Sequence, residues 1–184
     1  MKRLVIDTET TGLSPHHNKI LTVGMLLIDV TNKHLDILDK NHIFIKHENY
    51  NANPDSLKVN KIDLDKHHEI AVHPQIACEQ INTFVEKNTL HETPLLGHNI
   101  QFDKGFLSSL FSQGDSISSL HHESIDTMYL WRRLQSLGSI PTHLRATLQS
   151  LAGFFEVDYS KAHDALADCH ITAKVYHKML GIKK

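Results

Sequence analysis

Cysteine, proline and tryptophan are all scarce in this chain: its 184 residues include two cysteines, five prolines and one tryptophan. Two cysteines cannot supply the disulfide framework of a small secreted domain, and Cys78 and Cys169 both fall in segments that we expect to be helical. We therefore expect free, buried thiols in a reducing compartment, and hence a cytoplasmic protein. The sequence also lacks repeats and low-complexity stretches, which argues against disordered and solenoid classes.

Long apolar runs are missing as well, because no window reaches the length of a membrane-spanning helix. Met1-Lys2-Arg3 and the three apolar residues that follow imitate a signal peptide only until Asp7 interrupts them. We expect no membrane association. The chain is long enough for one full-sized core and short for two, so we expect a single domain over residues 1–184.

A strong charge excess is also absent: 19 Lys and Arg against 21 Asp and Glu give a formal net charge of −2. A protein that follows a long phosphate backbone usually has a basic face, so this balance favours bound cations for any phosphate contact. Histidine, in contrast, is abundant, with 16 copies that include doublets at 16–17, 67–68 and 121–122. A zinc or nickel store built on these doublets stays open, although their spacing supports no ligand set.

The segment 3–13 carries two acids into an apolar strand. The apolar residues Leu4-Val5-Ile6 precede the acids, and a Thr-Thr-Gly turn ends the strand after them. Because alternate side chains of a strand share a face, Asp7 and Glu9 should point together and Thr8 away from them. Two like charges on one buried face are unfavourable unless a cation lies between them, so the pattern indicates a metal site. A solvated strand end is the alternative that the spacing alone leaves open.

Periodicity predicts an α/β chain. The expected strands, of which the third pairs antiparallel with the second, cover about 3–10, 20–28, 35–46, 93–99 and 124–127. The expected helices cover about 56–59, 64–70, 74–87, 102–111, 128–137, 144–155 and a last stretch from Asp164, which can cap it.

Four acids arrive from three distant segments. Asp7 and Glu9 lie on the first strand, Asp103 lies at a strand-to-helix junction, and Asp168 lies on the last helix. Oxygen ligands select Mg²⁺ or Mn²⁺ over zinc, and a shared carboxylate set can hold two such ions at the attacking and leaving oxygens of a phosphodiester. His163, on the loop before the last helix, could accept the proton of an attacking water, since a free imidazole has a pKa of about 6.5.

Three motifs carry a resemblance to a known family. They are Ile6-Asp7-Thr8-Glu9-Thr10-Thr11-Gly12-Leu13, Gly97-His98-Asn99-Ile100-Gln101-Phe102-Asp103 and His163-Asp164-Ala165-Leu166-Ala167-Asp168. In this order they resemble the exonuclease motifs of the DEDDh superfamily, and the match extends over nearly the whole chain. The segments 53–62 and 125–127 also resemble secondary signatures of that family. The resemblance implies a ribonuclease H-like fold, with a five-stranded mixed sheet whose first three strands are antiparallel and which helices flank. It also implies that residues 1–184 form one 3′–5′ exonuclease domain.

The resemblance also implies roles for individual residues. Asp7, Glu9 and Asp168 resemble the direct ligands of the catalytic metals, Asp103 resembles the ligand of the second ion, and His163 resembles the general base. The implied substrate contacts are Thr8, Thr10, Leu13, His98, Asn99 and Phe102. Among them the Thr10 backbone would lie near the 3′ end and Leu13 would wedge against a base. Simple packing is the alternative for Leu13, and a core position is favoured for Phe102.

The implied substrate is a single-stranded nucleic acid with a free 3′ end, DNA in the first place, and the implied cofactor is a pair of Mg²⁺ or Mn²⁺ ions. RNA ends or oligoribonucleotides are the alternative, because the sequence does not expose how the 2′-hydroxyl is sensed. A polymerase or repair partner would be a separate chain. In a different class, the chain could be a binding subunit without turnover, but the complete set of five catalytic side chains argues against it. The sequence leaves the oligomeric state open.

Overall fold

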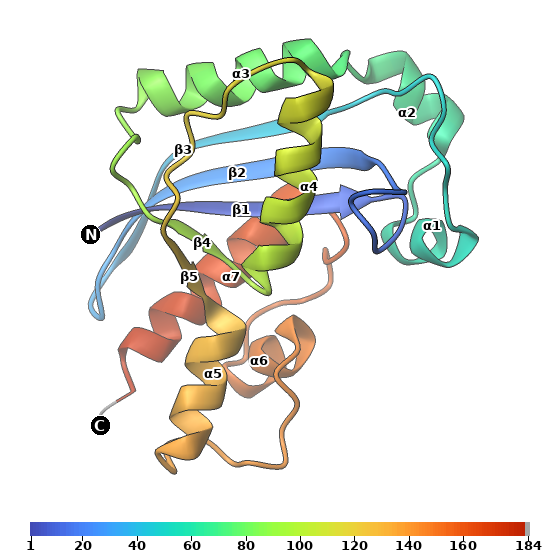
Figure 1. Ribbon diagram of the computed structural model, residues 1–184. Coiled ribbons are helices and arrows are strands. Elements are labelled where there is room, and N and C mark those ends of the chain that lie inside the picture. Colours follow the sequence, from blue (N-terminus) through green and yellow to red (C-terminus); the bar gives the residue numbers. More distant parts are fainter. Residues whose placement is uncertain (183–184) are drawn as a thin grey trace.

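The centre of the molecule is a five-stranded mixed sheet with the strand order β3-β2-β1-β4-β5 (Figure 1). The computed structural model describes residues 1–182. The strands are β1 (Lys2–Thr10), β2 (Ile20–Val30), β3 (Leu35–Phe44), β4 (Leu95–Gly97) and β5 (Ser124–Asp126). β2 is antiparallel to both β1 and β3, whereas β4 is parallel to β1 and β5 is parallel to β4. The expected mixed sheet, with its first three strands antiparallel, is confirmed.

Seven helices connect and flank the strands within residues 1–182. They are α1 (Pro54–Asn60), α2 (Leu64–Ile70), α3 (Pro74–Lys87), α4 (Ile100–Gln113), α5 (Thr127–Ser136), α6 (Leu148–Phe154) and α7 (Ala165–Leu180). The predicted caps hold: Pro74 opens α3, and the Asp164 side chain caps α7 by accepting from the backbone N–H of Ala167. None of the helices described for residues 1–182 has the length and apolar character that a membrane crossing needs.

One predicted helix was too long. The apolar spacing from Leu144 to Phe155 predicted a helix, but α6 begins only at Leu148. Thr147 is the N-cap, and its hydroxyl accepts from the backbone N–H of Ser150. The preceding segment is irregular because the Gln135 side chain donates to the carbonyl of Leu144. A tertiary hydrogen bond therefore overrides the helical spacing.

The two faces of β1 belong to different layers of the molecule. Leu4 and Ile6 pack in a core cluster with α3 and α4, whereas Val5 packs in a second cluster with α7. In Figure 1, α3 and α4 cover one face of the sheet and α7 covers the other. The alternation continues toward the end of β1, so Asp7 and Glu9 extend the row that faces α7.

α7 approaches the sheet closely at Gly24 of β2, the residue that pairs with Asp7. A Cβ atom at Gly24 would lie 2.4 Å from the backbone carbonyl of Ala165, the first residue of α7. Only a glycine therefore lets the start of α7 lie against the sheet beside Asp7. Cys169, one turn further along α7, is fully buried and directs its thiol to the carbonyl of Gly24. Cys169 and Cys78 are both free and buried, as expected.

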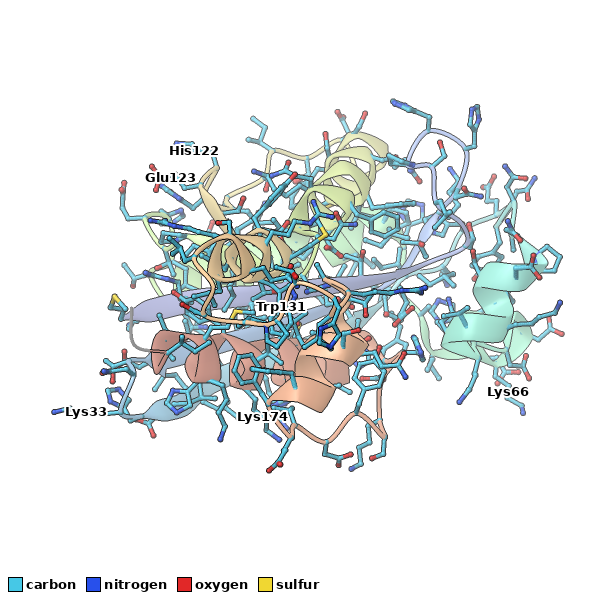
Figure 2. The ribbon with its side chains drawn as sticks, turned by 90° about the horizontal axis from the view of Figure 1, so that it is seen from below. Lys33, Lys66, His122, Glu123, Trp131 and Lys174 are labelled. Carbon is cyan, nitrogen blue, oxygen red and sulfur yellow. The ribbon has the colours of Figure 1, made fainter. Side chains whose placement is uncertain are left out.

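A third core cluster joins α5, α6 and α7. Its centre is Trp131, which is completely buried and meets Phe154 and Phe155 of the α6 segment edge to face. Figure 2 shows Trp131 between α5 and α6, while Lys33, Lys66 and Lys174 point outward. This cluster supports the loop that enters α7.

Candidate active site

Three carboxylates converge where the end of β1 meets the start of α7. One oxygen each of Asp7, Glu9 and Asp168 lies within 4.8 Å of the other two. β1 supplies the first two from one face of the strand, and the first turn of α7 supplies Asp168. The close approach at Gly24 places that turn over the strand. The expectation that Asp7 and Glu9 point together is confirmed.

This cluster is electrostatically unfavourable without a counter-charge. Burial raises the pKa of Asp7 well above its usual value, and the charges of Asp103, Asp168 and Glu9 raise it further. Burial, together with the charge of Asp168, raises the pKa of Glu9 to about 8. The acids thus lie in surroundings that favour their protonated forms unless a cation binds.

Hydrogen bonding compensates only partly for the burial of the Asp168 carboxylate. Burial raises its pKa, and the backbone N–H of His163, which donates to Asp168 Oδ2 at 3.1 Å, opposes this shift. The other oxygen, Oδ1, is buried and has no hydrogen-bond partner. A buried carboxylate oxygen without a donor is unfavourable, so Oδ1 is suited to a ligand that brings positive charge.

Asp103 reaches the site from the opposite face of β1. Thr8, which points away from Asp7 and Glu9, donates its hydroxyl to Asp103 Oδ1 at 2.8 Å. Both side chains are buried, and Asp103 lies in the first turn of α4. Burial raises the pKa of Asp103 to about 7, although the Thr8 hydrogen bond lowers it. Asp103 lies outside the group of three oxygens. Among the neighbouring charges, that of Asp103 has the largest effect on the pKa of Asp7.

The residues present fit a divalent cation. Within residues 1–182, no Lys or Arg side chain forms an ion pair with any of the four acids. An all-oxygen donor set suits hard ions such as Mg²⁺ or Mn²⁺. In the same part of the chain, no other three metal-ligating side chains come as close together. Among residues 1–182, the histidine doublets therefore belong to no such group of three.

His163 lies beside this cluster on the loop that enters α7. Its backbone adopts a left-handed conformation (φ 72°), and its side chain is exposed. The loop position is as expected, and the backbone N–H of His163 joins the loop to Asp168 through one hydrogen bond.

The six expected substrate contacts differ in accessibility. Leu13 is 80% exposed and Asn99 is also exposed, so both can meet a ligand. Thr8 and Thr10 are buried and their hydroxyls are engaged, the latter with the carbonyl of Gly12. Both hydroxyls therefore already donate to partners within the protein. Phe102 is partly buried on α4 and packs on Phe106, with ring centroids 4.9 Å apart.

The turn between β4 and α4 is held by the junction of β5 and α5. The Thr127 hydroxyl donates to the carbonyl of Gly97 at 3.0 Å, so it accepts from Nδ1 of His98 at 2.9 Å. Asp126 accepts from the backbone N–H of Asn99, whose φ of 62° is left-handed. His98 therefore braces the turn, while the exposed Asn99 side chain points out of it.

Sequence reasoning missed Tyr159. Its ring lies 6.2 Å from the imidazole of His163 and nearly perpendicular to it. Burial raises the pKa of Tyr159, and the charges of Asp168, Asp7 and Glu9 raise it further. A tyrosine four residues before a histidine is no signal by itself, so only the folded loop shows the relationship.

Comparison with known sequences agrees with this site. A family model described as exonuclease (RNase_T) matches residues 4–176. Ribonuclease T of Shewanella denitrificans is 29% identical over 181 residues, which cover 94% of this chain and 77% of the relative. The DNA polymerase III subunit epsilon of Pasteurella multocida is 28% identical over 185 residues, which cover 98% of this chain and 68% of the relative.

Solved structures agree on the fold. E. coli exonuclease I in complex with a dT13 oligonucleotide superimposes with a TM-score of 0.82 at 17% identity, over 96% of this chain. A second exonuclease I structure gives a TM-score of 0.84 at 19% identity, over the whole chain. The present chain spans about 40% of these exonuclease I chains. At such low identity the likeness shows the fold alone, and it confirms the expected ribonuclease H-like architecture.

Proposed function

Because the chain belongs to the exonuclease family, and with it to the DEDDh 3′–5′ exonuclease superfamily that its three motifs resemble, we propose that it releases nucleoside monophosphates from single-stranded 3′ ends with divalent metal ions. The observation that carries the proposal is the convergence of Asp7, Glu9 and Asp168 within 4.8 Å. These three would be the direct metal ligands, and Asp103 would serve the second of two ions. Mg²⁺ or Mn²⁺ is the expected metal.

Each residue has a distinct task in this proposal. Bound at these carboxylates, the divalent ions would supply Lewis-acid polarisation of the phosphodiester and neutralise the charge that develops on its oxygens. The His163 imidazole accepts a proton from the attacking water, and its exposed side chain can reach the incoming strand. The backbone N–H of His163 orients Asp168, and Thr8 orients Asp103.

The strand end would lie between the β1 turn and the start of α4. Leu13 offers an exposed apolar side chain to a terminal base, and Asn99 offers an exposed amide. Thr8 and Thr10 would act through their backbone groups, His98 through the turn that it braces, and Phe102 through the part of its ring that remains accessible. We place the enzyme in the cytoplasm, where its two free thiols would stay reduced.

Single-stranded DNA is the first proposed substrate, and dT13 is the ligand in the exonuclease I complex that shares this fold. RNA 3′ ends are the second, because relatives that cover 94% of this chain are named ribonuclease T. A proofreading or repair partner would be a separate chain.

Degradation ladders test the proposal. DNA and RNA strands, labelled at either end, are incubated with and without Mg²⁺. With a 5′ label, a 3′–5′ enzyme gives a ladder of progressively shorter strands, whereas a 3′ label is released at once as a mononucleotide. Asp7→Asn should abolish digestion, while Asp36→Asn, at an exposed acid of β3, should leave it unchanged. A protein that binds single strands but never shortens them, with either metal, would instead be the accessory subunit.

A further inference from the structure

The imidazole of His163 is held by little besides one aromatic ring. Its backbone N–H is bonded to Asp168, but within residues 1–182 its ring makes no hydrogen bond and no ion pair. The aromatic neighbour is Tyr159, whose ring lies edge to face with the imidazole at 83°, with centroids 6.2 Å apart. This geometry falls in the range of favourable aromatic pairs.

Tyr159 is itself partly buried at the margin of a core cluster. It packs against the core cluster of α5, α6 and α7 whose centre is Trp131. Its carbonyl accepts from the backbone N–H of Ala162 at 3.2 Å, which forms a tight turn directly before His163. The core cluster and this turn therefore support the tyrosine, and the exposed imidazole lies against its ring.

We propose that Tyr159 is a positioning residue for His163, and that its ring holds the imidazole at the edge of the carboxylate cluster. The proposal rests on the proposed exonuclease function, in which His163 accepts the proton of the attacking water. Besides burial, the charges of Asp168, Asp7 and Glu9 raise the pKa of the phenol, so Tyr159 lies near the acids as well as near His163. Without the ring, the imidazole would sample orientations that do not reach the water.

A purely structural role for Tyr159 predicts something different. In that case its loss would loosen the cluster around Trp131 and weaken stability, substrate binding and turnover together. A positioning role predicts a loss of turnover alone, and it predicts that this loss depends on His163.

Kinetics of five variants separate these roles. Tyr159→Leu should lower kcat about 2- to 10-fold, the range that such an aromatic contact supports, with KM unchanged. Tyr159→Phe, which keeps the ring, should restore the wild-type kcat. Tyr129→Leu, at an exposed tyrosine of α5, is the matched control and should have no effect. In a His163→Ala background, Tyr159→Leu should add no further loss. An equal loss in both backgrounds, or a Tyr159→Phe variant as slow as Tyr159→Leu, would overturn the proposal.

An NMR measurement tests the contact without any activity. The ring protons of His163, assigned through the signals that vanish in His163→Ala, should shift in Tyr159→Leu and stay in place in Tyr129→Leu. If Tyr159→Leu does not fold, nuclear Overhauser contacts between the two rings in the wild-type protein decide, and their absence overturns the proposal. If the contact is present in a protein that digests no nucleic acid, the proposed function fails while the contact stands.

Discussion

Thr8 and Asp103 are joined by a 2.8 Å hydrogen bond although 95 residues separate them in the sequence. The bond links the strand that carries Asp7 and Glu9 to the helix that carries Asp103. It also places the carboxylate of Asp103 on the side of β1 opposite to Asp168. The acidic site thus receives carboxylates from helices on both faces of the sheet.

Removal of the Thr8 hydroxyl should weaken catalysis. Thr8→Val keeps the shape but removes a hydrogen bond to a buried carboxylate, a loss of about 1.5–3 kcal/mol. The pKa of Asp103 should rise, because the Thr8 hydrogen bond lowers it. We expect kcat at neutral pH to fall roughly tenfold, measured with a labelled single strand. Thr172→Val is the matched control, because the buried Thr172 hydroxyl has no partner and its loss should not reduce activity. Equal rates for wild type and Thr8→Val would contradict a role of this hydrogen bond in catalysis.

Stability without metal should fall as the pH rises. The pKa values of Glu9 and Asp103 are raised in the folded protein, to about 8 and about 7, so the folded state holds protons more tightly than the unfolded state. Their favourable contribution is complete below the unfolded pKa of about 4 and is lost as the pH rises through 7 to 8. In EDTA, the Tm should therefore be lower at pH 8.5 than at pH 6, and Mg²⁺ should raise it more at pH 8.5. Asp7→Asn should flatten this pH dependence and raise the metal-free Tm. A mutant less stable than wild type in EDTA at pH 8.5 would refute this explanation.

Gly24 should tolerate no side chain. A Cβ atom there would overlap the backbone of Ala165 at 2.4 Å, so α7 would have to shift and would carry Asp168 and His163 with it. For Gly24→Ala we expect a loss of about 1–3 kcal/mol in urea unfolding and a weaker response of the Tm to Mg²⁺. Gly153→Ala, in α6, meets nothing within 4 Å and should be neutral or stabilising. If both glycine variants lost the same free energy of unfolding and kept the same Tm response to Mg²⁺, the close approach at Gly24 would not be needed for stability or metal binding.

His67 should make the protein sensitive to acid. It is buried, its Nε2 is 2.9 Å from the carbonyl of Ile45, and burial lowers its pKa. A lowered pKa means that the neutral form is favoured by folding, so this stability is present above the unfolded pKa of about 6.5 and is lost as the pH falls below it. His67→Gln keeps an N–H donor without the charge. Its free energy of unfolding should therefore drop less than that of wild type between pH 7.5 and pH 5. If the free energy of unfolding, measured in urea, fell equally in the two proteins between these pH values, His67 would not be a source of the acid sensitivity.

His163→Ala should separate chemistry from binding. We expect kcat to fall by about 10²–10⁴, the usual scale for the loss of a general base, while the Tm increase with Mg²⁺ is retained. The metal response should survive because the contact to Asp168 comes from the backbone N–H of residue 163, which alanine keeps. Unchanged turnover at neutral pH would remove His163 from the mechanism.

Local rules were sufficient for much of this fold. The period of two along β1 placed Asp7 and Glu9 on one face, and Pro74 and Asp164 marked the starts of α3 and α7. These features depend only on neighbours in the chain. Asp103 could be assigned to the start of a helix in the same way.

Contacts between distant segments could not be read in advance. The Thr8–Asp103 bond depends on α4 packing on one particular face of β1, and the contact at Gly24 depends on where α7 crosses β2. The early part of the predicted helix from Leu144 failed for the same reason, since the side chain of Gln135 binds that segment. Tyr159 acts through a turn whose shape no spacing rule specifies.

The position of α7 in the chain affects when the enzyme can first act. Asp168 lies on the last helix described, after every other part of the site has been synthesised. A polypeptide that has emerged from the ribosome only as far as α6 therefore has β1 and α4 but lacks one carboxylate of the cluster. We therefore expect such a nascent chain to hydrolyse no nucleic acid, and its hydrolytic activity to begin only once α7 has docked.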